Sequence, residues 1–333
     1  MPHSPVRRRS LRLAGGAIAA AGLGAPSWAQ TTASGLPSGT LKILVGYPPG
    51  GGTDVMARVL AEKLKERLNQ NVIIENRPGA SGTLAGAVLR DGPADGSVIM
   101  YVASAGTAAQ KVSKKQMPYD LEKDLATVTL AGTLCTVYAV SAKIGVKTFT
   151  EYVEWLKRNP SKASFGTTAM GSSTHFFGVQ LGKAIGIPLE PVAYKGAGPL
   201  ISDLSAGHAP AACGGLTDFL THHRADKLRI IAVSAPRRMK AAPDLPTIVE
   251  LGHPDLAIES YYGFFASAKV APGVIDAWNR ELRAVLETPE MRERMLGLGL
   301  EVQTSTPKEF FERQARYIEL FTRSMKAAGY EPE

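Results

Sequence analysis

A loop of glycines and prolines follows the first strongly apolar run of the chain. The run is 41–45 (Leu-Lys-Ile-Leu-Val), the loop is 46–52 (Gly-Tyr-Pro-Pro-Gly-Gly-Gly), and Thr53 and Asp54 open a helical pattern. The first N–H groups of a helix lack intrahelical partners and carry a partial positive charge, so a loop with little side-chain bulk there can bind a small anion. The alternative is an ordinary turn with Thr53 or Asp54 as the N-cap. The loop alone leaves both interpretations open.

The spacing of the glycines argues against a nucleotide site. Gly50, Gly51 and Gly52 are consecutive, which is not the Gly-x-Gly-x-x-Gly spacing of dinucleotide folds. The sequence also holds no Gly-x-x-x-x-Gly-Lys-Ser/Thr phosphate loop. We therefore expect an anion of carboxylate size rather than a polyphosphate.

Three further segments repeat this order of strand, polar or glycine-rich loop and helix start. They are 76–83, 167–175 and 192–198. All three present backbone N–H groups, and the first two add hydroxyl groups. Neutral donors that converge on one cleft suit a carboxylate, because an ionised oxygen buried without partners is costly and each charge-assisted hydrogen bond contributes roughly 1.5 to 3 kcal/mol.

The side chains of these loops also have structural interpretations. Ser172, Ser173 and Thr174 can be plain N-capping residues, and His175 can be a structural residue of a first helical turn. For these residues the structural role and ligand contact stay equally open. For Lys195 we favour a solvated side chain.

Catalytic machinery is hard to assemble from this sequence. It has no Gly-x-Ser-x-Gly elbow, and Ser172 and His175 share a helix start without an evident third member of a triad. Asp54 and Asp218 are too isolated in sequence to be claimed as paired carboxylates. The sequence offers hydrogen-bond donors and no acid/base pair.

The N-terminus has the pattern of a secretory signal peptide. Residues 1–29 hold four arginines, no acid, an apolar stretch at 13–25 and Ser-Trp-Ala at 27–29. We expect cleavage after Ala29, a periplasmic location and a disordered leader at 30–40. The arginine cluster suggests the twin-arginine route, and Sec export stays open because a strong hydrophobic pair does not follow it.

Composition excludes several classes of partner. Without residues 1–29 the chain has 34 basic and 30 acidic residues, a net charge of +4, and no long run of like charges. Nucleic acid is therefore not an expected partner. Cys135 and Cys213 lie in apolar stretches and are interpreted as buried thiols, with a disulfide left open. No metal-binding motif and no cofactor is expected.

The order of apolar runs and helical periodicity favours two α/β domains with doubly wound sheets. The expected buried strands are 41–45, 72–75, 97–102, 164–166, 191–194, 209–213 and 228–234. Longer strands at 124–140 and 259–267 are expected to cross between the domains. The first expected helix begins near residue 53. The other expected helices are 84–89, 149–157, 175–185, 199–205, 216–224, 274–286, 289–296 and 307–328. We expect the last helix to pack back on the first domain, and a ligand cleft at the carboxyl ends of the strands.

Eight short segments occur in a fixed order along the chain. They are Gly-Tyr-Pro-Pro-Gly-Gly-Gly-Thr-Asp (46–54) with Arg58, Glu-Asn-Arg-Pro-Gly-Ala-Ser-Gly (75–82), Pro-Ala-Asp-Gly (93–96), Pro-Tyr-Asp (118–120), Lys-Asp (123–124), Gly-Ser-Ser-Thr-His (171–175), Tyr-Lys-Gly (194–196) and Pro-Thr-Ile-Val-Glu-Leu-Gly (246–252). Together they resemble the substrate-binding proteins of tripartite tricarboxylate transporters, also called the Bug family of periplasmic receptors. The likeness covers nearly the whole mature chain.

The resemblance implies a two-lobed, type II periplasmic-binding fold that closes on a small organic acid. With the pattern of elements it gives lobe 1 at 41–135, lobe 2 at 136–258, and a return strand with C-terminal helices at 259–333 that pack on lobe 1. In this family the loop after the first strand and the Gly/Ser/Thr loop of the second lobe contact the carboxylate, often through ordered waters. The expected ligand-binding residues are Tyr47, Pro49, Gly50, Gly51, Thr53, Ser81, Ser104, Ala105, Thr167, Thr168, Gly171, Ser172, Ser173, Thr174, Tyr194 and Asp218.

One departure from the family pattern concerns the ligand. Many members carry an acidic residue near Gly214, where it can meet an amino group or a bridging water. Its absence leaves the ligand's identity more open and disfavours an amino acid.

The predicted function is that of a monomeric periplasmic receptor. It delivers a small carboxylate to the membrane components of a tripartite transporter, or to a sensor, and is not an enzyme. One rival is an exported enzyme in which Ser172, His175 or Asp218 acts on a small carboxylate. A second rival is an exported scaffold, which predicts a cleft filled by side chains.

Overall fold

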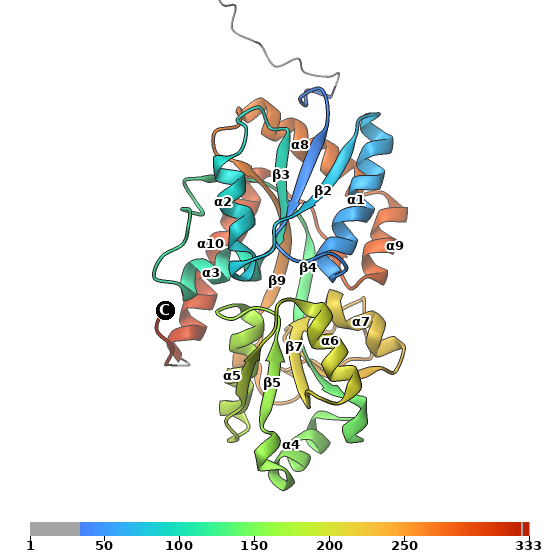
Figure 1. Ribbon diagram of the computed structural model, residues 1–333, viewed down its shortest axis with the longest axis vertical. Coiled ribbons are helices and arrows are strands. Elements are labelled where there is room, and N and C mark those ends of the chain that lie inside the picture. Colours follow the sequence, from blue (N-terminus) through green and yellow to red (C-terminus); the bar gives the residue numbers. More distant parts are fainter. Residues whose placement is uncertain (1–33, 328, 333) are drawn as a thin grey trace, which may run out of the picture.

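The computed structural model describes residues 34–327 and 329–332, and it has two α/β lobes stacked along the long axis of the molecule (Figure 1). Lobe 1 contains β1 Leu41–Val45, α1 Gly52–Leu68, β2 Val72–Asn76, α2 Thr83–Asp91, β3 Val98–Ala103, α3 Ala108–Ser113, α8 Pro272–Leu286, α9 Pro289–Gly297, β10 Glu301–Val302 and α10 Pro307–Ala327. Lobe 2 contains α4 Phe149–Arg158, β5 Ser164–Thr167, α5 Ser173–Ala184, β6 Glu190–Ala193, α6 Ala197–Ala206, β7 Ala211–Gly215, α7 Leu216–Arg224 and β8 Leu228–Val233. Two long strands, β4 Leu125–Ser141 and β9 Glu259–Ser267, connect the lobes.

The sheet of lobe 1 is covered by helices on both faces. Strands β2, β1 and β3 are parallel, and β9 continues the sheet antiparallel to β3. Leu41, Ile43 and Val45 of β1 pack with α1, α8 and α9, whereas Leu44 packs with α2, α3 and α10. A strand buried on both faces needs apolar residues on both, which is why this segment reads as a continuous apolar run.

Lobe 2 repeats the same three-layer construction. Strands β7, β5 and β6 are parallel, and β4 is antiparallel to β7 and β8. Leu200 of α6 and Phe219 of α7 pack on one face of this sheet, and Phe149 of α4 and Phe177 of α5 pack on the other. Each lobe therefore has a core of its own on each side of its strands.

Strand β4 passes from one sheet to the other. It pairs with β9 from Leu125 to Cys135, and with β7 and β8 from Thr136 to Ser141. The chain leaves lobe 1 through β4 and returns through β9, so the two connections between the lobes lie side by side. The predicted lobe boundaries at 135/136 and 258/259 stay a prediction as limits of domains.

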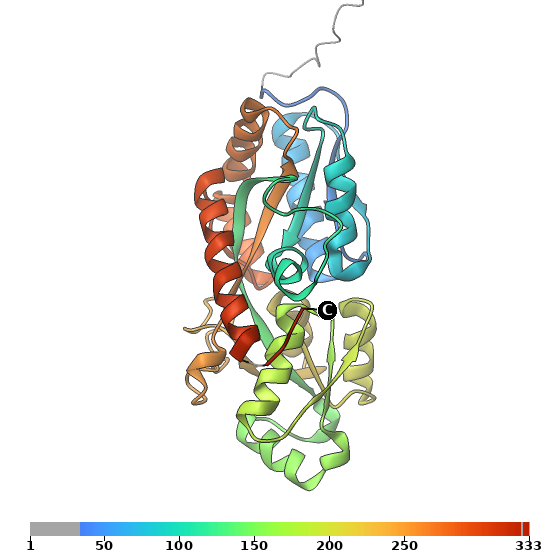
Figure 2. The same cartoon turned by 90° about the vertical axis from the view of Figure 1, so that its left-hand side faces the viewer.

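The last helix runs along lobe 1 towards α5 of lobe 2 (Figure 2). Phe310, Tyr317 and Phe321 of α10 belong to the buried core of lobe 1. Near its end, the side chain of Gln180 on α5 donates to the carbonyl oxygen of Ser324 at 2.8 Å and to its hydroxyl at 2.7 Å. Helix α10 therefore adds a contact between the lobes to the two crossing strands.

Strands and helices lie where the sequence predicts them, with ends that differ by at most two residues. The sequence pattern missed α3 and the two-residue β10, which are too short to show a period. The prediction of a disordered leader at 30–40 is wrong for residues 34–40, the part that the structure describes. Leu36 is buried in the core of lobe 1, and the side chain of Gln70 donates to the carbonyls of Pro37 and Gly39. The signal peptide, 1–29, lies outside the described residues.

Both cysteines are free thiols enclosed in the core of lobe 2, as the apolar stretches around them indicated. Burial raises the pKa of both thiols. Among the described residues, no helix combines the length and the apolarity needed to cross a membrane.

Replacing Gly263 of β9 by alanine should destabilise lobe 1. The new Cβ would lie 2.2 Å from the ring of Phe310, which is fully buried and cannot move aside. We expect unfolding in urea to show a loss of roughly 1 to 3 kcal/mol. The control is Gly273→Ala in α8, where no atom lies within 4 Å of the new Cβ and a small stabilisation is expected. Equal stability of the two variants would contradict this packing.

Candidate functional site

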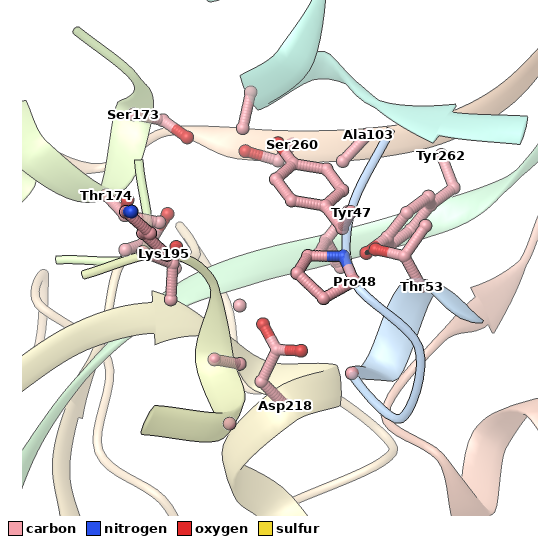
Figure 3. A pocket seen from close by; sticks show the side chains of 18 of the residues that line it. Tyr47, Pro48, Thr53, Ala103, Ser173, Thr174, Lys195, Asp218, Ser260 and Tyr262 are labelled. Atoms are coloured by element: carbon pink, nitrogen blue, oxygen red, sulfur yellow. Dashed lines mark hydrogen bonds between the residues drawn. The ribbon is translucent and has the colours of Figure 1, made fainter. Parts of the chain in front are cut away.

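A small cavity lies between the lobes, at the ends of their strands (Figure 3). Its volume is about 110 Å³. Lobe 1 and the crossing strands contribute Tyr47, Pro48, Pro49, Gly51, Thr53, Ala103, Ala105, Leu134, Thr136, Ser260 and Tyr262. Lobe 2 contributes Thr168, Ser173, Thr174, Lys195, Ala197, Gly198, Pro199, Gly215 and Asp218.

Four helices begin at the wall of this cavity. Lining residues include Gly51 and Thr53 at the start of α1, Ser173 of α5, Ala197 of α6 and Gly215 of α7. Each helix has at least nine residues and presents N–H groups without intrahelical partners, together with the positive end of its dipole. The cavity is therefore suited to an anion or to a polar group rich in oxygen.

Asp218 joins the two lobes at the floor of the cavity. Its Oδ1 accepts a hydrogen bond of 2.8 Å from the N–H of Gly52, the first residue of α1. It also accepts from the N–H of Gly215, the N-cap of its own helix. Burial raises the pKa of Asp218 to about 6, against the lowering effect of these two hydrogen bonds. No lysine, arginine or histidine of the described residues forms an ion pair with this carboxylate.

The wall opposite Asp218 is built from hydroxyl groups held in place by packing. Thr53 Oγ1 and the Tyr262 hydroxyl are 2.7 Å apart, and the Tyr262 ring stacks on Tyr101 with centroids 4.9 Å apart. The Tyr47 hydroxyl donates to the carbonyl of Ser81 at 3.3 Å. Burial raises the pKa of Tyr47 and Tyr262, and the nearby charge of Asp218 raises it further. Both hydroxyl groups therefore stay neutral.

The two lobes touch across the mouth of the cavity. A Cβ built on Gly52 would lie 2.8 Å from the backbone carbon and oxygen of Thr217, so the two backbones are in direct contact. On the other side of the mouth, Ser81 Oγ and Gln110 Nε2 both donate to the carbonyl of Met170, at 3.1 and 3.2 Å. The structure therefore has the lobes closed on each other.

A second, wider cavity of about 540 Å³ opens beside the first and shares Tyr47, Pro48, Thr168 and Lys195 with it. Gly46, residues 78–82, Ala169, Met170, Ala193, Tyr194 and Gly196 line the rest. Gly79 to Gly82 all have positive φ, including 47° at Ala80 and 59° at Ser81, a conformation that is costly for residues with a side chain. This strained turn and Gln110 of α3 are the parts of lobe 1 that contact Met170.

The structure brings together nine of the predicted site residues at the cavity wall, which are Tyr47, Pro49, Gly51, Thr53, Ala105, Thr168, Ser173, Thr174 and Asp218. Ser81 and Tyr194 line the second cavity instead. The remaining five, Gly50, Ser104, Thr167, Gly171 and Ser172, line neither. That any of them contacts a ligand stays a prediction.

Internal hydrogen bonds explain why parts of the lobe 2 loop turn away from the cavity. Ser172 Oγ donates to the carbonyl of Ala169 at 2.6 Å and lies 2.8 Å from Thr174 Oγ1. The Thr167 hydroxyl is 2.9 Å from Thr174 Oγ1, and the N–H of Gly171 donates to His175 Nδ1 at 3.2 Å. These groups shape the loop. Ser172 occupies the N-cap position of α5 without a capping hydrogen bond from its side chain, and its buried hydroxyl does not line the cavity.

In lobe 1, the N–H of Gly50 and the hydroxyl of Ser104 also have partners within the lobe and do not line the cavity. The N–H of Gly50 donates to Asp54 Oδ2 at 2.9 Å, and φ of Gly50 is 87°. Ser104 Oγ is buried and accepts from the N–H of Tyr261 at 3.4 Å. The alternative interpretation of the loop made Thr53 or Asp54 the N-cap of α1, and that part of it is wrong because Gly51 occupies the N-cap position.

Sequence reasoning missed several lining residues. Ser260 and Tyr262 lie two residues apart on β9 and so face the same side of the strand. The one available signal was that a strand crossing between lobes must pass under the cleft. Lys195, interpreted as a solvated side chain, is exposed to solvent but also lines the cavity (Figure 3).

Packing explains why position 214 carries a glycine and no acid, and a nearby residue supplies a carboxylate. A Cβ at Gly214 would lie 2.0 Å from the ring of Phe219, so no side chain fits there. Asp218, in the first turn of α7, supplies a carboxylate to the cavity instead. No group of three or more potential metal ligands occurs among the residues that the structure describes.

Comparison with known proteins gives consistent matches. A family model described as "Tripartite tricarboxylate transporter family receptor" matches residues 56–316. The chain is similar to protein BugT of Bordetella pertussis, strain Tohama I, with 30% identity over 90% of this chain and 91% of BugT. Its fold is similar to that of the periplasmic binding protein BugD, with a TM-score of 0.84 and 26% identity over 89% of this chain and 100% of that one. A protein of R. palustris solved with adipate has a TM-score of 0.84 at 24% identity, over 89% and 99% of the two chains. The two-lobed periplasmic-binding fold predicted from the sequence is confirmed.

Asp218→Asn removes the ionisable group but keeps an oxygen that can accept the Gly52 N–H. With a pKa of about 6 in the folded state and about 3.9 in the unfolded state, Asp218 binds its proton more tightly when folded. The stability of the wild type relative to the variant should therefore fall as the pH rises from about 4 to about 6 and stay lower above that range.

Urea unfolding without ligand at pH 4 and pH 8 measures this effect. From pH 4 to pH 8, the unfolding free energy of the variant should increase by roughly 1 to 3 kcal/mol relative to that of the wild type. Asp276→Asn, which removes an exposed carboxylate on α8, gives the background. A difference between Asp218→Asn and wild type that does not vary with pH would show that Asp218 has an ordinary pKa.

Proposed function

The chain belongs to the family of tripartite tricarboxylate transporter receptors, and from this membership we propose that it captures a small organic carboxylate by closure of its lobes and delivers it to a tripartite tricarboxylate-type transporter. Its partners in this role are the acid and the membrane components of the transporter. We further propose that residues 1–29 direct export to the periplasm, are removed after Ala29, and leave a monomeric receptor.

One observation carries this proposal: four helix N-termini meet at a cavity that both lobes enclose. Helix N-termini bind anions through N–H groups and dipoles, with no need for a matching cation. Ser173 and Thr174 add hydroxyl groups at one of these N-termini. The cavity of about 110 Å³ suits a ligand of a few carbon atoms. The similar fold solved with adipate holds a dicarboxylate, which makes this class the first to test.

The rival, an exported enzyme, has less support from the geometry. Ser172 bonds to Ala169 and Thr174, neither of which is a base, and it does not line the cavity. His175 Nδ1 accepts from the N–H of Gly171. Asp218 is the one perturbed acid of the cavity wall, and no nucleophile among the described residues is within hydrogen-bond reach of it. The scaffold rival predicts a filled cleft, and an open cavity disfavours it.

A thermal-shift screen of mono-, di- and tricarboxylates tests the receptor function. At least one acid should stabilise the protein strongly, since a ligand at 100 times its Kd adds ~2.7 kcal/mol. The bound acid should be recovered unchanged after long incubation with the protein, as followed by NMR. If no acid moves the midpoint, the proposal fails; turnover of the acid would favour the enzyme.

Gly52→Ala should weaken ligand binding without destabilising the fold. The added Cβ would lie 2.8 Å from the backbone of Thr217, so the lobes cannot close to the arrangement described above. We expect the Kd of the best acid to rise at least tenfold, about 1.4 kcal/mol, in isothermal titration. The unfolding free energy should stay the same or rise slightly, because alanine favours the helix.

The matched control for this variant is Gly273→Ala, which likewise adds a Cβ in the first turn of a helix. No atom lies within 4 Å of this Cβ, and Gly273 lines neither cavity. The control should bind the acid with a Kd within about threefold of the wild type. A Gly52→Ala protein that binds as tightly as Gly273→Ala would mean that the contact between Gly52 and Thr217 is not part of the ligand-bound state.

A further inference from the structure

Asp218 is a carboxylate enclosed in the cavity wall without a cation to balance it. Its two hydrogen bonds come from the N–H groups of Gly52 and Gly215, and each carboxylate oxygen can accept more than one. An acid held this way is stabilised by a further donor that enters the cavity. In Figure 3 the carboxylate rises from the floor of the cavity towards the space below Tyr47 and Pro48.

The same cavity presents a cation and a hydroxyl group. Lys195 lines it from the loop before α6 and forms no ion pair with any described residue, Asp218 included. Ser260 lies in the wall formed by β9, next to the hydroxyl group of Tyr317. These three groups stand on different elements around one space, and among the described residues neither of the two charges is paired with an opposite charge.

A plain carboxylic acid satisfies only part of this arrangement. Its carboxylate can be bound by Lys195 and by the helix N-termini, but its hydrocarbon part offers nothing to Asp218. A second carboxylate next to Asp218 would place like charges together in an enclosed site. A hydroxyl or ammonium group at that position would donate to Asp218, and an ammonium group would also balance its charge.

We propose that Asp218 is a specificity-determining residue that selects acids carrying a hydrogen-bond donor, either a hydroxyl or an ammonium group, in addition to the carboxylate. This inference rests on the receptor function proposed above and narrows its ligands to hydroxy acids and amino acids. It reverses the expectation that the absence of an acid at Gly214 disfavours an amino acid, because Asp218 fills that role from the next helix. Sites built to bind a donor discriminate strongly against analogues that lack it.

Matched acids that differ only at carbon 2 test the inference by isothermal titration. The sets are propionate, lactate and alanine; succinate, malate and aspartate; and adipate, 2-hydroxyadipate and 2-aminoadipate, with both enantiomers of each substituted acid. Within the chain length that binds best, we expect the hydroxy or the amino acid to bind at least tenfold more tightly than the unsubstituted acid. Which of the two is preferred identifies the donor.

Two variants assign the preference to Asp218. In Asp218→Asn, which keeps an acceptor for the Gly52 N–H, the advantage of an ammonium group should fall below about threefold, and that of a hydroxyl group should shrink. In the control, Lys195→Gln, all acids of a set should weaken by similar factors, so their ratio should not change. Asp218→Ser serves as a second replacement if the asparagine variant folds poorly.

The outcomes separate this inference from the receptor function. If wild-type protein binds the unsubstituted acid as tightly as its substituted partners, or if Asp218→Asn keeps the full preference, the inference is wrong and the receptor function stands. If none of the acids binds, the receptor function fails and the inference with it.

Discussion

The hydrogen bond between the Gly52 N–H and the Asp218 carboxylate is the contact on which the cavity depends. It connects the first residue of α1 in lobe 1 with the first turn of α7 in lobe 2. It forms only because the backbones at Gly52 and Thr217 approach within a distance that excludes any Cβ on Gly52. The glycine loop that follows β1 therefore brings the two lobes into contact, beyond the anion binding proposed for it, and its third glycine, Gly52, is the one that tolerates no side chain.

The electrostatics of the site combine two opposing features. Four helix N-termini and Lys195 make the cavity favourable for negative charge, yet a carboxylate of the protein is already present within it. The N–H groups that hold Asp218 stabilise its charged form, while burial opposes ionisation and raises its pKa to about 6. A cavity with a positive rim and an acidic floor is polarised, and a ligand with its own positive or donor end matches that polarity better than a symmetric anion does.

The sequence predicted the elements of the fold well because their signals are local. The apolar run before Gly46 and the helical period after Gly52 are readable without knowledge of the rest of the chain. Which residues at the start of a helix face the cleft cannot be predicted from the local sequence. Ser172 and Ser173 are neighbours of the same chemical type, yet one bonds inward to Ala169 and the other lines the cavity.

Residues on the crossing strand escaped prediction for a similar reason. Ser260 and Tyr262 belong to an apolar segment that reads as core, and only the partners of β9 in space show that one face passes beneath the cavity. The orientation of Lys195 depends on how the lobes close, which no local pattern encodes. The crossing strands β4 and β9 pair with each other, and α10 adds hydrogen bonds to α5. Two covalent connections that pair side by side oppose twisting of one lobe against the other, which favours bending about the strands as the way in which the lobes would open and close. In the receptor function proposed above, a ligand would then have little rotational freedom of the lobes left to remove.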